Sequence, residues 1–484
     1  MKNATDALYM PAVAVSILVW FTSIAAPLWL DETATYWQIS AGAAQVWARR
    51  GVLFPAYNYI LWAWSQVFGI AEVTLRIPSI LAMLGAALVI FRIARFFFDH
   101  DAALFATISF CLNPIVVNAA SDARPYAFAV LDLSLCVLVL LQWTRTNQLR
   151  YAVWLGVFIA GLFYFHYLFV LMTLPLAVLL AITAKPSDAN LFRKQLSIAG
   201  VVLILLTIPV LPAIVDLFHA GGQIGQIVFA PKPRVFQIAY VLNGLPFLSF
   251  VSLFLIIAAG GHVAVNEDKS LFSTGTICLM LCAIPLGILF AVSRWTSLNV
   301  FVYRYTLMAV PGVALCCGYL FNRIDSKIFR LLACLLFLFA GISPYKFTTH
   351  APHFYSWKEA LGVADATAHR DGAPLLICSD FAESNFRRMP QDPYHDPAFA
   401  PLSYYHVSSR VVPLPRSVTS ETKRQVDSFL QTSVPERRRF LLLTYIGSKG
   451  TIRWVAEHTS GSYSSRPIGV FDDVTVTEFI LKDN

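Results

Sequence analysis

The sequence has few charged residues, and its cysteines do not have the spacing of a disulfide framework that stabilises a small protein. Lys, Arg, Asp and Glu form 13% of its 484 residues, against about 25% in ordinary soluble domains. Seven of the eight cysteines lie inside apolar runs, and the eighth, Cys378, stands alone in the polar C-terminal part. These absences exclude a disulfide-rich secreted domain, a zinc module and a plain cytosolic enzyme.

Motifs for phosphate cleavage and for common hydrolysis are also missing. There is no Gly-rich phosphate loop, no HExxH and no GxSxG, so NTP hydrolysis and the common hydrolases have no support. The net charge of +8 does not indicate a nucleic-acid partner, because residues 350–484 hold 15 basic and 15 acidic side chains while residues 1–349 hold 21 and 13. The basic excess lies in the apolar part, as expected of loops beside lipid headgroups.

The sequence does contain long apolar runs. Apolar residues make up 57% of the chain, and the mean hydropathy is +0.63. Runs near the roughly 20 residues that cross a bilayer predict eleven spans of a polytopic α-helical membrane protein. The predicted spans are 8–28, 76–98, 102–120, 125–143, 151–164, 167–183, 196–216, 236–260, 273–292, 303–321 and 328–345.

Basic residues in the loops favour a cytoplasmic N-terminus. With that orientation the inner loops hold twelve Lys and Arg and the outer loops nine, in the sense of the positive-inside rule. Only Lys2 precedes the first run, and Pro27 follows Ala25-Ala26, which predicts an uncleaved anchor rather than a signal peptide. An odd number of spans places the C-terminal residues outside. We therefore expect a multi-pass protein of the bacterial inner (cytoplasmic) membrane with its C-terminal domain in the periplasm.

The composition changes after Tyr345, which divides the chain into a membrane domain, 1–345, and a soluble domain, 346–484. In the soluble part, the predicted strands are 373–380, 438–447 and 474–481. Residues 356–369 predict an amphipathic helix with Ser356 as its cap. We expect a small extracytoplasmic α/β domain.

The first outer loop, 29–75, is too polar to span a membrane and too aromatic for a slack connection. Five of the eleven tryptophans lie between positions 29 and 64, and Trp favours the membrane interface. Trp37, Ala41, Ala44 and Ala48 share helical spacing. We predict two amphipathic helices that lie along the outer leaflet.

Asp31 and Glu32 begin this loop, directly after the first predicted span, and two interpretations stay open. In one, Asp31 caps a helix by accepting backbone N–H bonds, and Glu32 complements the helix dipole. In the other, a carboxylate at the water–lipid boundary takes a proton from an incoming nucleophile. The two agree only in part, because a capping carboxylate has a lowered pKa and is a weaker base.

Two arginines occupy the starts of outer helices, where a cation is unfavourable. In the segment 121–126, Ser121 or Asp122 suits the cap of the next helix, whereas Arg124 opposes its dipole at a cost of about 0.3–1 kcal/mol. Arg304 repeats this placement at the start of the tenth predicted span. A nearby anion would offset the cost: Asp122 or a lipid headgroup in one interpretation, the phosphate of a bound substrate in the other.

Further polar groups follow along the chain. His166 marks a short outer turn within the apolar residues 151–183, and a lone histidine of this kind is more often structural than functional. Arg294 and Tyr305 accompany Arg304 at the start of the tenth predicted span. Asp132 lies in mid-span, where an acid is costly and usually paired, and both a structural and a functional role stay open for it.

These outward groups suit a transferase whose donor is already in the membrane. Nucleotide sugars are made in the cytoplasm, on the opposite side. A polyprenyl-phosphate sugar meets the requirement, because its tail enters between helices, its phosphate meets arginine and its sugar lies under the carboxylates.

Five segments, in this order, resemble the GT-C glycosyltransferases. That broad group contains the protein O-mannosyltransferases, the lipid A aminoarabinose transferase and the rhizobial lipopolysaccharide galacturonosyltransferases. The segments are DETATYW (31–37), FPAYNYILWAWSQVFG (54–69), LRIPSIL (75–81), SDARPYAF (121–128) and YRYTLMAVPGVAL (303–315). Their order and spacing extend over most of residues 1–320, and their joint order is typical of the superfamily rather than of one substrate.

The resemblance implies an inverting transfer from a polyprenyl-phosphate sugar to a glycan, lipid or protein acceptor of the cell envelope. By carry-over, Asp31 is the general base, and Glu32 orients the acceptor or shares the proton. Arg124 and Arg304 would stabilise the departing lipid phosphate. The remaining residues of the predicted site are Tyr57, Asp122, Tyr126, His166, Arg294 and Tyr305.

The sequence departs from the family in one place. Many relatives carry His-Pro-Pro before the Tyr of the first loop, whereas Leu53-Phe54-Pro55 stands here, so any action of that His on the substrate is replaced or lost. No metal or other cofactor is predicted with certainty. Asp31, Glu32 and Asp122 leave a divalent cation open, but they form no dedicated cage.

Two other functions compete with this interpretation. A transporter or lipid flippase would need charges and broken helices near the midplane, in repeated halves, and Asp132 is the residue that favours it. A non-catalytic membrane scaffold would use the loop motifs as caps and anchors alone. For both functions the expected partners include membrane lipids and no nucleic acid.

Overall fold

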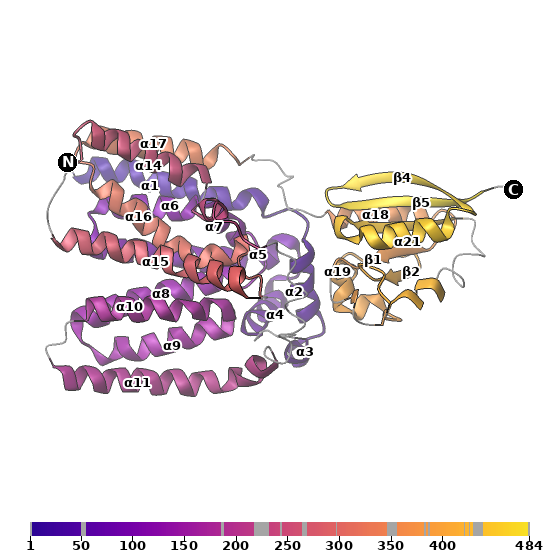
Figure 1. Ribbon diagram of the computed structural model, residues 1–484, viewed down its shortest axis with the longest axis horizontal. Helices are drawn as coiled ribbons and strands as arrows, with labels where there is room; N and C mark the ends of the chain where they lie inside the picture. The colour runs from indigo at the N-terminus through magenta and orange to yellow at the C-terminus, as the bar shows by residue number, and fades with distance from the viewer. Residues whose placement is uncertain are drawn as a thin grey trace. The chain divides into compact units, whose positions relative to one another are not determined.

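The chain forms two compact units (Figure 1). The structure, a computed structural model, describes residues 2–49, 55–184, 188–216, 232–242, 244–263, 269–296, 298–345, 356–381, 384–385, 388–420, 422–424, 426–428 and 439–482. Contacts between residues assign Met1–Ala25 and Trp47–Thr349 to the first unit, and Ala26–Val46 and His350–Asn484 to the second. The short segment after the first helix therefore groups with the C-terminal residues, while the division at Tyr345 stays a sequence-based prediction.

The first unit is helical. Its elements are α1 (Lys2–Leu18), η1 (Val19–Ser23), α4 (Ala56–Phe68), α5 (Glu72–Phe97), α6 (His100–Cys111), α7 (Pro114–Ala120), α8 (Tyr126–Thr146), α9 (Leu149–Phe165), η2 (Tyr167–Met172), α10 (Thr173–Thr183), α11 (Ala189–Thr207), η3 (Ile208–Val210), α13 (Gln237–Val241), α14 (Gly244–Ala259), α15 (Lys269–Trp295), η4 (Tyr303–Ala309), α16 (Val310–Asn322) and α17 (Lys327–Ile342). Each of the eleven predicted spans overlaps at least one of these elements.

Length and composition identify five helices able to cross a membrane among the described residues. They are Glu72–Phe97, Tyr126–Thr146, Ala189–Asp216, Thr274–Trp295 and Tyr303–Asn322. The pair α6 and α7 passes the same test together but is bent by 66°, and four further apolar helices are shorter. The structure is thus mostly helical and has several helices long and apolar enough to cross a membrane, while the count of eleven spans stays a prediction.

The bend between α6 and α7 interrupts what the sequence predicts as one span, 102–120. Asn113 accepts a hydrogen bond from the Ile115 backbone N–H over 3.0 Å, and Pro114 occupies the first position of α7. Because proline has no N–H to continue the ladder of α6, a new helix starts there with its own cap.

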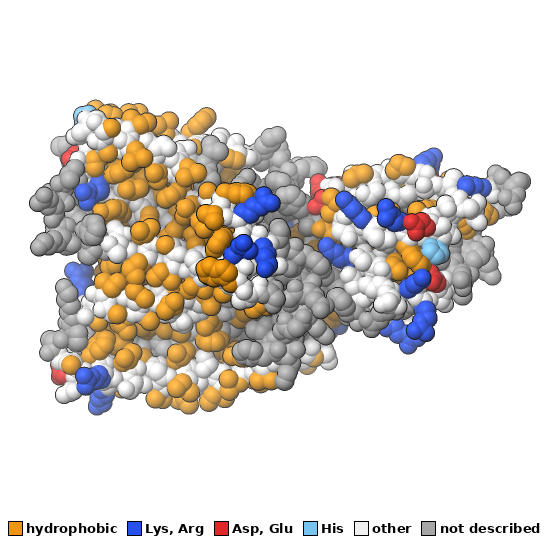
Figure 2. Space-filling view, viewed as in Figure 1, with side chains coloured by type: hydrophobic (Ala, Val, Ile, Leu, Met, Phe, Trp, Pro, Cys, Tyr) orange, Lys and Arg blue, Asp and Glu red, His pale blue; other side chains and the backbone are white. Residues whose placement is uncertain are grey.

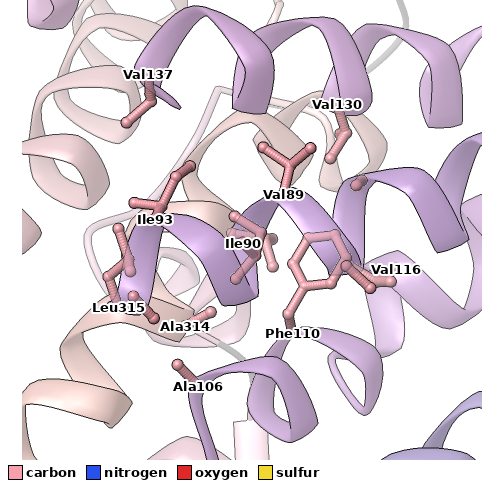
Figure 3. Packing of buried hydrophobic residues seen from close by; sticks show 14 of the residues in the cluster. Val89, Ile90, Ile93, Ala106, Phe110, Val116, Val130, Val137, Ala314 and Leu315 are labelled. Atoms are coloured by element: carbon pink, nitrogen blue, oxygen red, sulfur yellow. The ribbon is translucent and has the colours of Figure 1, made fainter. Parts of the chain in front are cut away.

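The core of the first unit lies around α5. Figure 3 shows Val89, Ile90 and Ile93 of α5 among apolar side chains of α6, α7, α8 and α16, and all of these residues are buried. Other apolar side chains point outward, such as Leu88 and Phe339, and Figure 2 shows them over much of the visible helical surface. An apolar exterior around a buried core is what lipid surroundings require.

Helices α15 and α16 approach so closely that only glycine fits at position 312. A Cβ at Gly312 would lie 2.8 Å from Cys282 Cα and nearer still to the adjoining backbone atoms. We expect Gly312→Ala to destabilise the protein by about 1–3 kcal/mol through overpacking. The matched control is Gly287→Ala in the same pair of helices, where a Cβ meets nothing within 4 Å. Thermal unfolding in detergent should separate the two variants, and equal midpoints would contradict this packing.

The second unit contains a mixed five-stranded sheet with helices on both faces. Its elements are α2 (Leu30–Ser40), α18 (Trp357–Ala368), β1 (Leu375–Cys378), η6 (Pro393–His395), η7 (Pro397–Phe399), α19 (Ala400–Tyr404), β2 (Val411–Leu414), β3 (Arg439–Tyr445), η8 (Ile446–Ser448), α21 (Lys449–Thr459), β4 (Tyr463–Phe471) and β5 (Val474–Leu481). The strand order is β2-β1-β3-β5-β4, parallel across β2, β1 and β3 and antiparallel at β5 and β4.

Alternate residues of each central strand enter different cores. Leu375 and Ile377 of β1 pack with α18 and α19, whereas Leu376 and Cys378 pack on the other face with α21. The predicted strands match β1, β3 and β5, and the predicted helix matches α18. Ser356 stands at the N-cap position of α18, but its side chain makes no cap hydrogen bond. The sequence reading did not include β2 and β4; β4 is largely exposed and interrupted by a proline, so its pattern is weak.

The first outer loop forms three helices rather than the predicted two: α2, α3 (Ala43–Ala48) and α4. The extra break follows from Gly42, whose φ of +89° is a conformation that L side chains rarely adopt. Whether these helices lie along the outer leaflet stays a prediction.

Candidate active site

Asp31 and Glu32 both lie in the first turn of α2, in the second unit. The N-cap position belongs to Trp29, whose backbone N–H donates to Glu32 Oε2 over 3.2 Å. The interpretation of Asp31 as the helix cap is therefore wrong. Because α2 begins at Leu30, Glu32 is its third residue, and that position lets the Glu32 side chain accept from the backbone N–H of the N-cap residue. Glu32 is buried and Asp31 is half-buried. Glu32 thus has a structural task that the sequence reading assigned to its neighbour.

A second group of predicted residues comes together in the first unit, and we call Arg124, Tyr126, His166, Arg304 and Tyr305 the arginine–tyrosine cluster. Arg124 and Tyr126 stand where α8 begins, His166 separates α9 from η2, and Arg304 and Tyr305 begin η4. Three short breaks between apolar helices thus supply all five side chains. Each residue stands at a helix boundary because the chain turns there at one end of its apolar run.

His166 lies at the centre of this cluster. Its ring centroid is 5.3 Å from that of Tyr126 and 5.3 Å from that of Tyr305, and the two tyrosine rings are 6.5 Å apart. The Arg304 guanidinium carbon lies 5.5 Å from the centre of the Tyr305 ring, which is cation–π range. Residues from the middle and from the end of the helical unit therefore share one buried aromatic surface.

The two arginines make the surroundings of His166 electrically positive. Burial, followed by the charges of Arg124 and Arg304, lowers the pKa of His166 from 6.5 to about 3. The ring is therefore neutral at neutral pH, and its Nδ1 atom is buried without a hydrogen-bond partner among the described residues. The same positive potential that keeps a proton off the histidine would attract an anion.

Comparisons with known proteins give a consistent picture. Residues 54–212 match the family model described as dolichyl-phosphate-mannose-protein mannosyltransferase. That stretch includes Tyr57, Arg124 and His166. No curated protein matches this chain in sequence.

Solved structures extend the similarity over the full length. ArnT from Cupriavidus metallidurans bound to undecaprenyl phosphate is 15% identical, with a TM-score of 0.57 and 98% of each chain covered. ArnT in the apo state from the same organism is 16% identical, with a TM-score of 0.53 and the same coverage. The chain has the GT-C fold. Arabinofuranosyltransferase AftD from Mycobacteria is also similar, at 14% identity and a TM-score of 0.49, over 99% of this chain and 42% of that one. The family model and the two ArnT structures confirm the resemblance seen in the sequence motifs.

Within the GT-C fold, Tyr57 of α4 reaches the same end of the helices as His166. Its ring meets Phe128 of α8 at 5.5 Å, and Phe128 meets Phe165 at 5.5 Å, next to His166 in the chain. Asp122 is buried in the turn between α7 and α8, and its carbonyl accepts the Arg124 backbone N–H over 2.8 Å. Pro125, and not Ser121 or Asp122, stands at the N-cap position of α8.

Arg294 differs from the other predicted site residues, since it is exposed at the end of α15. Asp31 and Glu32 belong to the other unit, so their convergence with the arginine–tyrosine cluster stays a prediction. The described residues contain no group of three or more His, Cys, Asp or Glu able to hold a metal ion. A divalent cation on Asp31, Glu32 and Asp122 stays a prediction, because these carboxylates belong to two different units.

Arg76 is a buried cation whose role the sequence reading missed, because it counted the residue with the outer loop charges. The side chain is fully buried, and its Nη1 donates to the carbonyls of Ser23 over 3.2 Å and Ile24 over 2.9 Å. These carbonyls lie at the C-terminal end of η1, where Ser23 is the last residue and Ile24 the C-cap, so Arg76 caps that end. The signal was its position inside an apolar helix within LRIPSIL, a motif of the GT-C group.

The neutral state of His166 predicts a pH dependence of stability. Its folded-state pKa lies below the ordinary value, so the unfolded chain binds the extra proton as the pH falls from 6.5 to about 3. The contribution of the neutral His166 ring to the free energy of unfolding is complete above pH 6.5 and is lost as the pH falls below that value. The loss is about 2 kcal/mol near pH 4.5–5. We expect the thermal unfolding midpoint in detergent to fall on acidification by less in His166→Phe than in the wild type. Equal falls would contradict a buried neutral imidazole.

Proposed function

We propose that this protein is a GT-C-type glycosyltransferase that moves a sugar from a polyprenyl-phosphate donor to an acceptor of the cell envelope. The observation that carries the proposal is the positive potential of Arg124 and Arg304 around the buried, neutral His166. A phosphate would be stabilised there by charge-assisted hydrogen bonds. In support, ArnT, a protein of this fold, was solved with undecaprenyl phosphate, and the matching family model is named for a dolichyl-phosphate-mannose enzyme.

The proposed reaction is an inverting substitution at the anomeric carbon of the sugar. Asp31 takes the proton from the acceptor hydroxyl as its oxygen forms a bond to that carbon. The bond from the anomeric carbon to the phosphate oxygen breaks, and its electron pair leaves with the polyprenyl phosphate. Arg124 and Arg304 then face more negative charge than in the bound donor, so they stabilise the transition state more than the ground state.

The aromatic residues fit the parts of the donor beside the phosphate. Arg304 lies over the Tyr305 ring at 5.5 Å, and the rings of Tyr126 and Tyr305 are 6.5 Å apart. Tyrosine combines an apolar ring with a hydroxyl, which suits both the face of a sugar ring and its hydroxyl groups. Tyr57 would contribute in the same way. We place this chemistry at the outer face of the bacterial inner membrane, with the C-terminal domain in the periplasm.

A reconstituted assay tests the function directly. Protein in liposomes would be given a panel of labelled polyprenyl-phosphate sugars and extracts of envelope glycolipids and polysaccharides. We expect label in an acceptor, and mass spectrometry of the envelope should show that sugar missing when the gene is deleted. Movement of the lipid-linked sugar across the bilayer without transfer would instead identify a flippase. An unchanged envelope together with no transfer from any donor would contradict the proposal.

A further inference from the structure

Strand β2 is an edge of the five-stranded sheet and pairs on one side with β1. A cavity of about 550 Å³ lies beside it, lined by residues 388–391 and 410–413, and we call this cavity the β2 groove. Because successive side chains of a strand point to opposite faces, a cavity lined by four successive residues follows the edge of the sheet. Its volume lies within the range of about 300–1,000 Å³ that is usual for small-molecule sites.

The wall of the β2 groove that lies outside the strand is anchored to the rest of the second unit. Shortly before this wall, Ser384 Oγ accepts the Arg416 backbone N–H over 2.9 Å. Asn385 Oδ1 accepts the Ser417 backbone N–H over 2.7 Å. Within the wall, Met389 is buried in the core that contains α18 and α19. The groove is therefore a built part of the fold, with both of its walls tied to the sheet or to its core.

Arg388 and Arg410 bring two positive charges to the β2 groove, one from each wall. Both side chains are exposed, and neither guanidinium has a hydrogen bond or an ion pair with another described residue. Arg439, a structural arginine of the same unit, instead lies 2.7 Å from Asp371 and 2.6 Å from Glu478. No acid is found among the described residues that line the groove. Two like charges without a counter-charge favour an anion between them.

Carboxylates near the two walls already have other partners. Asp392 follows the loop wall in the sequence, where it accepts the Tyr394 backbone N–H over 3.0 Å and lies 2.7 Å from His395 Nδ1. Asp365 lies beside the start of β2, where it accepts the Ser409 backbone N–H over 2.9 Å. Both carboxylates are thus oriented by groups other than the arginines of the groove, whose guanidinium groups remain available to a ligand.

The backbone of β2 disfavours an extended peptide as the occupant. The carbonyls of Arg410 and Leu414 face the β1 side, where each accepts a backbone N–H over 2.9 Å. By the two-residue alternation of a strand, Val411 and Pro413 then face away from β1. Proline has no N–H to offer to an added strand, which is a common protection of sheet edges. Recognition by side chains fits this groove better than strand addition.

The side chains of the β2 groove suit an anionic saccharide. A guanidinium group binds carboxylate or phosphate oxygens through paired, charge-assisted hydrogen bonds. Pro390 and Val411 add apolar surface, which can cover the C–H face of a sugar ring. Gln391 adds an amide that can both donate to and accept from sugar hydroxyls. This mixture of apolar surface and a few polar groups is typical of small-ligand sites.

We propose that the β2 groove binds an anionic saccharide, with a carboxylate or phosphate group held by Arg388 and Arg410. The groove shares no residue with the arginine–tyrosine cluster, so it is a second saccharide site in this chain. That the bound saccharide is part of the acceptor rests on the proposed function. The C-terminal residues then select acceptors by charge, as complementary electrostatics does in other binding sites.

Direct binding to the full-length protein in detergent is the first test, with ligand-observed NMR titrations as the measurement. The probes are glucuronate and glucose 6-phosphate as charged sugars, glucose as the uncharged sugar, and acetate and inorganic phosphate as anions without a sugar. We expect at least one charged sugar to bind about 10-fold more tightly than glucose and than the free anions. Arg388→Ala/Arg410→Ala should weaken that binding about 10-fold or more, because the hydrogen bonds to the anion are lost.

The matched control is Arg370→Ala/Arg453→Ala, which removes two exposed arginines of the same unit outside the β2 groove. This variant should bind the charged sugar as the wild type does. An equal loss of binding in the control and in the groove variant would assign the effect to net charge and overturn the proposal. Equal affinities of the wild type and the groove variant would overturn it as well, as would free anions that bind as tightly as the charged sugars.

Transfer in liposomes is the second test, and it separates this inference from the proposed function. Envelope extracts would serve as acceptors before and after phosphatase treatment and chemical reduction of their carboxylates to alcohols. We expect the acceptor KM of the wild type to rise about 10-fold when these charges are removed, whereas the KM of the groove variant should not depend on them. Transfer with a charge-independent KM in the wild type would overturn the acceptor role of the groove and leave the proposed function intact. No transfer from any donor would contradict the proposed function, while the binding titrations would still decide whether the groove takes an anionic saccharide.

Discussion

The Asp31→Asn protein is expected to lose glycosyl transfer by about 10²–10⁴-fold, the usual contribution of a general base. The amide has the size of the carboxylate but accepts no proton at neutral pH. Since Glu32, and not Asp31, caps α2, the substitution leaves the cap in place. We therefore expect normal expression and an unfolding midpoint close to the wild-type value. The readout is single-turnover transfer from a polyprenyl-phosphate sugar in liposomes.

Asp101 provides a matched control for this substitution. It is the second residue of α6, as Asp31 is the second residue of α2. Each carboxylate therefore has the same position relative to the dipole of its own helix. Asp101→Asn should remove the same dipole contribution, about 0.3–1 kcal/mol, without loss of transfer. Full turnover in Asp31→Asn, or an equal loss in Asp101→Asn, would eliminate the base assignment.

Replacement of Arg304 by Ala is expected to raise the donor requirement about 10- to 100-fold. A hydrogen bond to a charged group contributes about 1.5–3 kcal/mol, and a phosphate between Arg124 and Arg304 would lose one of its two cations. Because the charge on the phosphate grows as the bond breaks, kcat should fall as well. Arg304→Lys keeps the positive charge but loses the planar guanidinium group. Its donor requirement should therefore lie between those of the wild type and of Arg304→Ala. The measurement is transfer rate against donor density in liposomes.

The control for Arg304 is an arginine with a similar local contact. The Arg150 guanidinium carbon lies 4.8 Å from the centre of the Tyr151 ring, much as Arg304 lies over Tyr305. Arg150 is exposed at the beginning of α9, about 24 Å along that helix from His166 at its other end. Arg150→Ala should leave the donor dependence unchanged. If Arg304→Ala and Arg150→Ala shift the donor dependence equally, the cause is the loss of surface charge, and Arg304 is not part of the donor site.

The helical architecture could be predicted because its causes are local. Apolar runs of about 20 residues indicate spans wherever they occur, and the period-two and period-3.6 patterns after Tyr345 indicate β1, β3, β5 and α18. The two errors in the predicted helices arose from single residues, which act over a shorter range than these patterns. Gly42 divided a predicted helix, and Pro114 bent a predicted span, since a single residue with an unusual backbone requirement outweighs the average of its neighbours.

All five members of the arginine–tyrosine cluster could be predicted from the sequence, but their geometry could not. Arg124 and Arg304 were recognisable as cations placed against a helix dipole, and that signal needs only their immediate surroundings. That His166 lies between the two tyrosines depends on the packing of α8, α9 and η4. The neutral state of its ring follows from burial and from both guanidinium groups together, which no stretch of sequence contains.

The composition and order of the residues predict a helical membrane protein, their motifs resemble those of the GT-C group, and they indicate the groups that would carry its chemistry. The tertiary structure assigns the tasks: Glu32 caps α2, the helix that contains Asp31, and Arg76 caps the end of η1. The reason is that hydropathy and helix signals act over tens of residues, whereas burial and charge act through space between segments hundreds of residues apart.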